Sequence, residues 1–244
     1  MRIAAVGDVH VGEDSGGLLR PALEHLADHA DVLLLAGDLT RHGTMAEATV
    51  MAEEFANLPV PVVAVLGNHD HHSDCGDGIT KLLQDTGITV LEGSSVTLEL
   101  PGGTLGVAGV KGFGGGFAGK CASRFGEREM KSFVEHTMAA ADALRTALSG
   151  LDTDVVVALT HYAPVKDTLH GEPPEIYPFL GSYLLGEAID ATGTSLALHG
   201  HAHFGSEQGV TPGGVRVRNV AQPVIKKAYA TYVLEPDLLE SATR

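Results

Sequence analysis

The chain has 244 residues, 44% of them hydrophobic and 19% charged, which is the balance of a globular protein with a sizeable core. Its formal net charge of −15, from 16 Lys and Arg against 31 Asp and Glu, argues against nucleic-acid binding and against an anionic membrane surface, because both need clustered cations. No apolar run is long enough to span a membrane, and residues 3–6 are too few for a signal peptide, so we expect a cytoplasmic protein.

No shift in composition divides the chain, so we expect residues 1–244 to form a single domain. The sequence holds two cysteines, Cys75 and Cys121. Two thiols in a chain of this length favour free cysteines in a reducing compartment, although a disulfide between them stays open. The oligomeric state is not readable from the sequence.

The first part of the chain predicts alternating strands and helices. Short, wholly apolar runs are typical of strands covered on both faces, and they occur at residues 3–6, 32–36 and 60–66. Apolar residues at helical spacing predict helices at residues 18–30, 44–55 and 79–84. Thr44 and Glu47 have the spacing of a capping box at the start of the second helix. Successive strand ends lie about thirty residues apart, the length of one βαβ unit, and right-handed crossovers place such ends side by side.

The second part of the chain predicts more strands and one long helix. We expect strands at residues 88–91, 96–100, 105–110, 155–159, 196–198, 215–217 and 228–234. We expect helices at residues 127–148 and 183–191. The glycine-rich residues 112–119 predict a flexible lid, the proline-containing residues 162–182 an irregular functional loop, and residues from Pro236 onward a frayed end.

Five of the predicted strands end in a similar way, with a short polar cluster that contains Asp, Asn or His directly after the apolar run. The clusters are Gly7-Asp8-Val9-His10, Gly37-Asp38, Gly67-Asn68-His69-Asp70, Thr160-His161 and His199-Gly200-His201-Ala202-His203. Polar groups at the end of a buried strand are costly without partners. The repetition therefore predicts one polar site built from distant parts of the chain.

The side chains in these clusters are those of a metal site. The carboxylates, amide and imidazoles are Asp8, His10, Asp38, Asn68, His69, His161, His201 and His203. A set with these groups and no thiolate suits borderline divalent ions such as Mn, Fe, Zn, Co or Ni. Because eight groups exceed the needs of one ion, we expect two divalent metal ions, with Asp38 on the central strand as the bridging ligand. Paired ions of this kind are the usual device for displacement at phosphorus.

In their order and spacing, these five blocks resemble the signature blocks of the calcineurin-like metallophosphoesterase family, over residues 7–203. The resemblance implies an α/β fold, a four-layer αββα sandwich of two packed mixed β-sheets flanked by helices. It also implies that one metal is held by Asp8, His10, Asp38 and His203. The other metal would be held by Asp38, Asn68, His161 and His201.

The same resemblance implies the chemistry of the site. His69 would be the general acid beside the substrate, oriented by Asp70, and the nucleophile a hydroxide held between the two metals. An acid in this position contributes about 10²–10⁴-fold to the rate. We therefore expect a metal-dependent phosphoester hydrolase.

One departure from the family bears on the substrate. Protein phosphatases of the family have Asp-Arg after the second block, whereas this chain has Arg41 one place early with no acid before it. We therefore favour a phosphodiesterase acting on a small diester such as a cyclic nucleotide. A monoesterase or nucleotide phosphatase and a non-catalytic scaffold of the same fold stay open. Candidate substrate contacts are Arg41, His42, His71, His72 and Tyr162.

Overall fold

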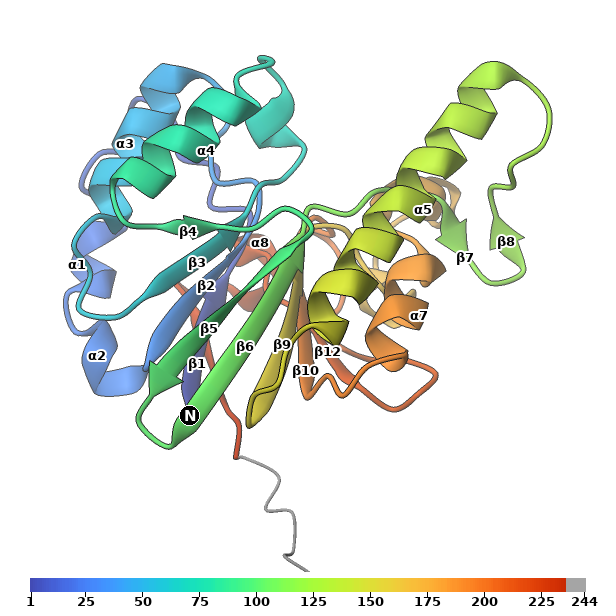
Figure 1. Cartoon of the computed structure of the whole chain (residues 1–244). Coiled ribbons are helices and arrows are strands. Elements are labelled where there is room, and N and C mark those ends of the chain that lie inside the picture. The colour runs from blue at the N-terminus through green and yellow to red at the C-terminus, as the bar shows by residue number, and fades with distance from the viewer. Residues whose placement is uncertain (236–244) are drawn as a thin grey trace, which may run out of the picture.

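The computed structural model describes residues 1–235, and the predicted fraying from Pro236 onward lies outside them. Two β-sheets pack face to face at the centre, with helices outside each sheet (Figure 1). This is the expected four-layer α/β sandwich. Within the described residues, no helix combines the length and the apolar character needed to cross a membrane.

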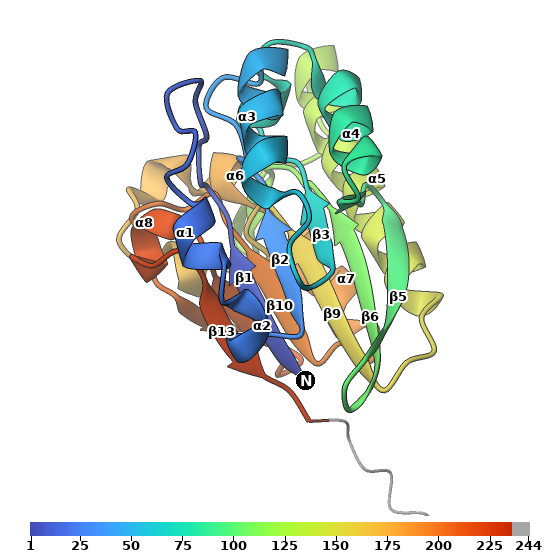
Figure 2. The ribbon, with the colours of Figure 1, turned by 90° about the vertical axis from the view of Figure 1, so that its left-hand side faces the viewer.

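The first sheet has the strand order β13-β1-β2-β3-β4. Its strands are β1 (Arg2–Val6), β2 (Val32–Ala36), β3 (Val62–Val65), β4 (Thr89–Val90) and β13 (Ala230–Val233). β1, β2, β3 and β4 are parallel, and β13 is antiparallel at the edge. The helices on its outer face are α1 (Arg20–Leu23), α2 (Leu26–His29), α3 (Met45–Phe55) and α4 (Gly76–Asp85) (Figure 2).

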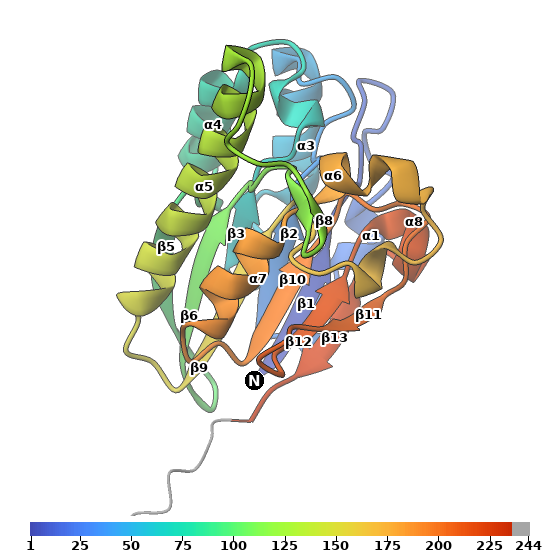
Figure 3. The same cartoon turned by 90° about the vertical axis from the view of Figure 1, so that its right-hand side faces the viewer.

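The second sheet has the order β11-β12-β10-β9-β6-β5. Its strands are β5 (Ser94–Leu100), β6 (Gly103–Val110), β9 (Val155–Thr160), β10 (Leu196–His199), β11 (Gln208–Val210) and β12 (Arg216–Asn219). A hairpin joins β5 and β6, whereas β6, β9, β10 and β12 are parallel neighbours. The helices on its outer face are α5 (Arg128–Ser149) and α7 (Tyr183–Asp190) (Figure 3).

Alternation along β1 shows why these strands have no polar face. Ile3 and Ala5 pack between the two sheets, while Ala4 and Val6 pack under the outer helices. All four side chains are fully buried. A strand covered on both sides needs apolar residues at every position, so its first polar side chains come where it ends. The parallel strands of both sheets therefore carry their polar residues to the same rim of the sandwich.

Two segments in the first half of the chain differ from the sequence-based expectations, whereas the favoured interpretation of the two cysteines is confirmed. Residues 18–30 form two short helices separated at Glu24–His25, and the first begins at Arg20 because the buried Glu54 carboxylate accepts hydrogen bonds from the N–H groups of Leu19 and Arg20. β3 begins two residues late because Pro61 has no N–H for the ladder. Cys75 and Cys121 are both free.

The segment at residues 112–119 is not the open lid that its glycines predicted. It passes beneath α6 (Tyr177–Leu180) and forms β7 (Gly116–Phe117), which pairs with β8 (Lys120–Cys121). A Cβ at Gly114 would lie 2.5 Å from the carbonyl oxygen of Pro178, so glycine is required there for close packing rather than for motion. The predicted loop at residues 162–182 is likewise organised, by α6 and the short 3-10 helices η2 (Asp167–Leu169) and η3 (Pro174–Ile176). The short helix α8 (Gln222–Ile225) was not predicted.

Candidate metal centre

The backbone at the strand ends is shaped to bring the polar side chains together. Asp8, His10, Asp38 and His201 all have positive φ angles, between 44° and 70°. Positive φ is uncommon for residues other than glycine, and residues that adopt it are often found at functional sites. Gly67 is needed as well, since a Cβ there would collide with the Asp38 side chain.

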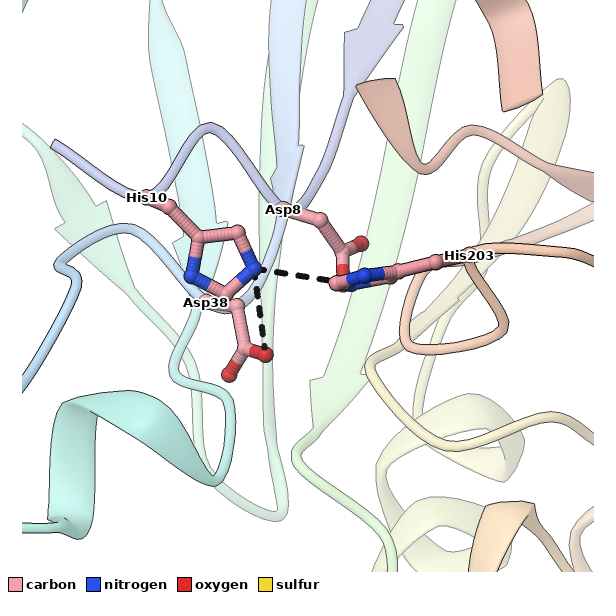
Figure 4. Close-up of side chains that lie close together, drawn as sticks. All are labelled: Asp8, His10, Asp38 and His203. Carbon is pink, nitrogen blue, oxygen red and sulfur yellow. Dashed lines mark hydrogen bonds and ion pairs between the residues drawn. The ribbon is translucent and has the colours of Figure 1, made fainter. Parts of the chain in front are cut away.

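The first group of candidate ligands consists of Asp8, His10, Asp38 and His203, and each offers an atom within 4.8 Å of the others. Figure 4 shows these four side chains converging from three separate loops. His203 Nε2 lies 2.8 Å from Asp8 Oδ1, and His10 Nε2 lies 3.4 Å from His203 Nε2 and 3.8 Å from Asp38 Oδ2. Asp8 and Asp38 are buried, whereas the two imidazoles are only partly covered.

The second group consists of Asp38, His161 and His201, with Asn68 beside them. His161 Nε2 lies 3.3 Å from Asp38 Oδ1 and 3.0 Å from Asn68 Oδ1. The other ring nitrogen of His161, Nδ1, donates to the carbonyl oxygen of Ala36 at 2.8 Å, and this fixes Nε2 as the nitrogen that faces the site. Asp38 belongs to both groups, as expected of a bridging carboxylate.

The donor set fits two divalent ions. Imidazole nitrogens and carboxylate oxygens point at shared positions, and His10 and His203 face one another through the same kind of nitrogen. Such converging lone pairs repel unless a proton or a cation lies between them. Mixed nitrogen and oxygen donors without a thiolate match borderline metals. The residues that the resemblance assigned to each ion are therefore the residues that the fold gathers.

Asp38 controls the electrostatics of the site. Burial opposes ionisation of Asp38, but its contacts with His161 outweigh burial and hold the pKa of the carboxyl well below its usual range. Burial also opposes the charged form of His161, and the Asp38 carboxylate again outweighs it, raising the pKa of His161 to about 9. For His201 burial prevails, and the pKa is lowered to about 3. In the absence of metal, the shared carboxylate and His161 thus form a buried ion pair.

His69 lies beside the two groups rather than within them. Its Nε2 is 3.9 Å from Asp38 Oδ2, and its ring centroid is 4.5 Å from that of His10. The backbone N–H of His69 donates to Asp38 Oδ1 at 2.8 Å. The ring is partly exposed, so Nε2 can meet a molecule that approaches the carboxylate from solvent.

The expectation that Asp70 orients His69 is wrong. The His69 ring is held instead by the carbonyl oxygen of Arg41, 2.7 Å from Nδ1. Asp70 is fully buried, and burial raises the pKa of its carboxyl. Its two oxygens accept hydrogen bonds from the N–H groups of Gly67, Leu39 and Thr40 and from the Thr40 hydroxyl, at 2.6–3.1 Å. Asp70 therefore ties together the loops that carry Asp38 and Asn68.

The five candidate substrate contacts lie in different surroundings. The Arg41 guanidinium pairs with the exposed Asp14 at 3.0 Å. His42 Nδ1 lies 2.9 Å from the buried Glu47 carboxylate, which leaves its Nε2 facing solvent, and the His72 ring is 6.4 Å away. His71 is exposed. Tyr162 is buried, and its ring centroid is only 4.3 Å from that of His201.

Two residues near the site were not among the predicted ones. Glu47 was recognised only as a helix cap, which it is, but it also fixes the ring of His42. Lys111 follows β6 directly, and its carbonyl oxygen accepts hydrogen bonds from the N–H groups of His161 and Tyr162. Lys111 was missed because the sequence pattern considered only carboxylates, amides and imidazoles after each strand, and lysine is none of these.

Comparison with known proteins gives a consistent assignment of fold. The phosphopantetheinyl hydrolase of Mycobacterium tuberculosis has a similar structure, with a TM-score of 0.70, 14% identity and 96% of each chain covered. A putative 5′-nucleotidase from Staphylococcus aureus has a TM-score of 0.56 and 14% identity, over 89% of this chain and 48% of that one. GAP50, described as the anchor in the inner membrane complex of Plasmodium, has a TM-score of 0.57 and 11% identity, over 91% of this chain and 72% of that one.

No curated protein sequence matches the chain. The family model described as calcineurin-like phosphoesterase matches residues 1–205, and this range contains every candidate ligand. The match confirms the resemblance drawn from the five blocks. The chain belongs to the calcineurin-like phosphoesterase family and is a metal-dependent phosphoesterase.

Proposed function

We propose that the protein hydrolyses a small phosphodiester at a centre of two divalent ions shared through Asp38. The observation that carries this proposal is the position of the Asp38 carboxylate, which belongs to both groups of ligands and has His69 Nε2 at its open side. The ions would be two of Mn, Fe, Zn, Co or Ni. When bound, they supply a nucleophilic water at neutral pH and neutralise charge on the phosphoryl oxygens.

The chain's own residues have three tasks in this proposal. Asp8, His10 and His203 hold the first ion, while Asn68, His161 and His201 hold the second. His69 donates a proton from Nε2 to the leaving oxygen, and the Arg41 carbonyl keeps the ring turned toward the site. Asp70 is a positioning residue, because it contacts only the loops that carry the ligands.

On the side of the site that carries Arg41 and His69, the charges favour a diester over a monoester. A monoester phosphate carries about two negative charges near pH 7 and is usually held by added arginine or lysine side chains. The guanidinium that follows the second block, on Arg41, is paired with Asp14 instead. His42 and His72 offer weaker hydrogen-bonding contacts, which suit the single charge of a diester. With a net charge of −15, a small molecule suits the site better than a nucleic acid.

A monoesterase is the second candidate, and one neighbour in fold is described as a putative 5′-nucleotidase. A non-catalytic scaffold is the third, and another neighbour is described as an anchor. Against a scaffold stands the complete set of ligands, since a chain released from catalysis has no need to keep four residues at positive φ around one carboxylate.

Metal content and two aryl esters distinguish these candidates. Protein loaded with Mn²⁺ should hold two equivalents of metal and hydrolyse bis(4-nitrophenyl) phosphate faster than 4-nitrophenyl phosphate. The reverse preference would establish a monoesterase. Two bound equivalents with neither ester hydrolysed would favour the scaffold.

A further inference from the structure

Lys111 carries an ammonium group that forms no ion pair within residues 1–235, although the Glu92 carboxylate accepts a hydrogen bond from its backbone N–H. Its side chain is partly buried at the end of β6, and burial lowers its pKa, with Glu92 and Asp38 partly opposing this effect. Among residues 1–235, the ion pairs of lysine and arginine do not include Lys111. Withdrawing an ammonium group from water without a counter-charge is costly.

The surroundings of Lys111 compensate for only part of that cost. An ammonium group has three N–H donors. One of them donates to the carbonyl oxygen of Gly112 at 3.2 Å. The rings of Phe113 and Tyr162, with centroids 5.0 and 5.2 Å from Nζ, offer their negative faces but no lone pair. Two of the three N–H donors of the ammonium group therefore have no hydrogen-bond acceptor within residues 1–235, although the chain is rich in carboxylates.

The position of this ammonium connects it to the metal centre. The Tyr162 ring that faces Nζ lies 4.3 Å from the His201 ring, and the Lys111 carbonyl holds the N–H of His161. Lys111 therefore stands beside the second group of ligands. It forms no ion pair with Asp38, although the charges of the two groups interact, so its donors are not used by the shared carboxylate. The natural place for its partner is the part of the substrate next to the scissile phosphate.

We propose that Lys111 binds a second phosphate of the substrate, so that the substrate is a small phosphodiester with a further phosphate on one of its two arms. The proposal rests on the proposed diesterase function and makes its substrate class specific. A terminal phosphate suits the site because its charge, close to two near pH 7, and its several acceptor oxygens match the spare donors of Lys111, which forms no ion pair within residues 1–235.

Two thymidine esters that differ by one phosphate test this proposal. They are thymidine 5′-(4-nitrophenyl phosphate) and its 3′-phosphorylated form. In both, water attacks the 5′ phosphorus, the bond from phosphorus to the nitrophenyl oxygen breaks, and 4-nitrophenolate is released and measured by absorbance. Metal-loaded protein should prefer the 3′-phosphorylated ester. In Lys111→Met the preference, as the ratio of the two kcat/KM values, should fall about ten- to a hundredfold, the effect of a charged hydrogen bond.

Controls separate binding from folding. Lys111→Arg keeps the charge and should restore most of the preference. Lys81→Met removes an exposed lysine that pairs with Asp85 on α4, and it should leave the preference as it is in the unmodified protein. Equal preference in Lys111→Met and the unmodified protein, or an equal loss on both esters, would overturn the proposal. An equal loss would mean that Lys111 serves the scissile phosphate or the fold.

Failure of the diesterase proposal itself has a different signature. In that case neither thymidine ester is hydrolysed while 4-nitrophenyl phosphate is. Calorimetric titration with thymidine 3′,5′-bisphosphate and thymidine 5′-phosphate then decides the role of Lys111. Tighter binding of the bisphosphate, lost in Lys111→Met, supports a second phosphate site. Equal affinities overturn it.

Discussion

Both rims supply their polar groups within four residues of a strand end, but the loop of the second rim that carries His201 and His203 has additional support from a distant segment. Asp8 and Asp38 each come two residues after a strand. His201 and His203 lie in a loop that is braced from outside, because His201 Nε2 contacts the Phe179 carbonyl at 3.2 Å and the N–H of Phe204 donates to Glu172. The second rim therefore depends on residues 172 and 179 as well as on its own strand ends.

The two rims also differ in charge. The first sheet contributes both carboxylates of the metal-binding groups, while the second contributes only imidazoles. The closest contacts therefore run between the sheets, from Asp8 to His203 at 2.8 Å and from Asp38 to His161 at 3.3 Å. Protons hold these pairs together in the absence of metal, and cations take the place of those protons on binding. The centre thus links the two sheets to one another in addition to binding the substrate.

Asp38→Asn should break this junction and have the largest effect. The amide keeps the shape of the side chain but loses the charge that both groups share. We expect metal content to fall from two equivalents to one or none, measured by elemental analysis, and kcat to fall by at least roughly a thousandfold. Asp14→Asn, on the exposed loop near Arg41, is the matched control for loss of one carboxylate. Two retained equivalents in Asp38→Asn would refute the bridging role.

His69→Ala should separate chemistry from metal binding on the first rim. The ring lies outside both groups of ligands, so both metals should stay bound while kcat falls about 10²–10⁴-fold. The loss should shrink for esters with acidic leaving groups such as 4-nitrophenolate, because these need little protonation. His29→Ala, at an exposed position on α2, serves as the control. If metal and activity disappear together, His69 is a ligand rather than an acid.

Asp70→Asn should act on stability more than on chemistry. The amide NH₂ would face either the N–H donors of Gly67 and Leu39 or that of Thr40, which the two carboxylate oxygens now satisfy. Leaving such buried groups unpaired costs about 2–4 kcal/mol of unfolding free energy, which lowers Tm by roughly 5–15 °C in a chain of this size. Asp74→Asn on the same loop is exposed and should have little effect. An unchanged melting temperature with lower kcat would return Asp70 to a role in orienting His69.

The sequence predicted the polar residues of both rims because their signals are local. An apolar strand that stops at a glycine followed by an aspartate needs no knowledge of the rest of the fold, and Asp38 was assigned correctly to the central strand. The capping box at Thr44 and Glu47 was predicted for the same reason. The four-layer arrangement itself came from the family resemblance, since strand patterns do not show which sheet a strand joins.

Distant contacts account for the errors. The start of α1 depends on Glu54, more than thirty residues along the chain, which no helical pattern at residues 18–30 can register. The partner of His69 is a backbone carbonyl, which every residue has, so no sequence pattern identifies it, and the role given to Asp70 came from the family resemblance. Buried glycines at residues 112–116 look the same in sequence as mobile ones, because glycine permits both close packing and free rotation.

The smallest expected effect is a change in the pH dependence of stability. It tests the contribution of His161, the second-rim partner of Asp38. His161 has an ordinary pKa of 6.5 in the unfolded chain and about 9 in the folded one, so the folded state holds its proton more tightly. The resulting stabilisation is complete below pH 6.5 and is lost as the pH rises through 9. Chelator-treated protein should therefore melt at progressively lower temperature between these values.

Metal should abolish this decline, because a ligating imidazole is neutral and has no proton to lose. Thermal melts of the Mn²⁺-loaded protein should be nearly flat from pH 6.5 to 9, and the gap between the two curves should widen as the pH rises. His161→Gln should flatten the curve of the chelated protein, whereas His25→Gln, at an exposed site, should keep its slope. Parallel curves with and without metal would mean that the metal does not replace a proton on His161. The ion pair between Asp38 and His161 would then not contribute to the contact between the two sheets.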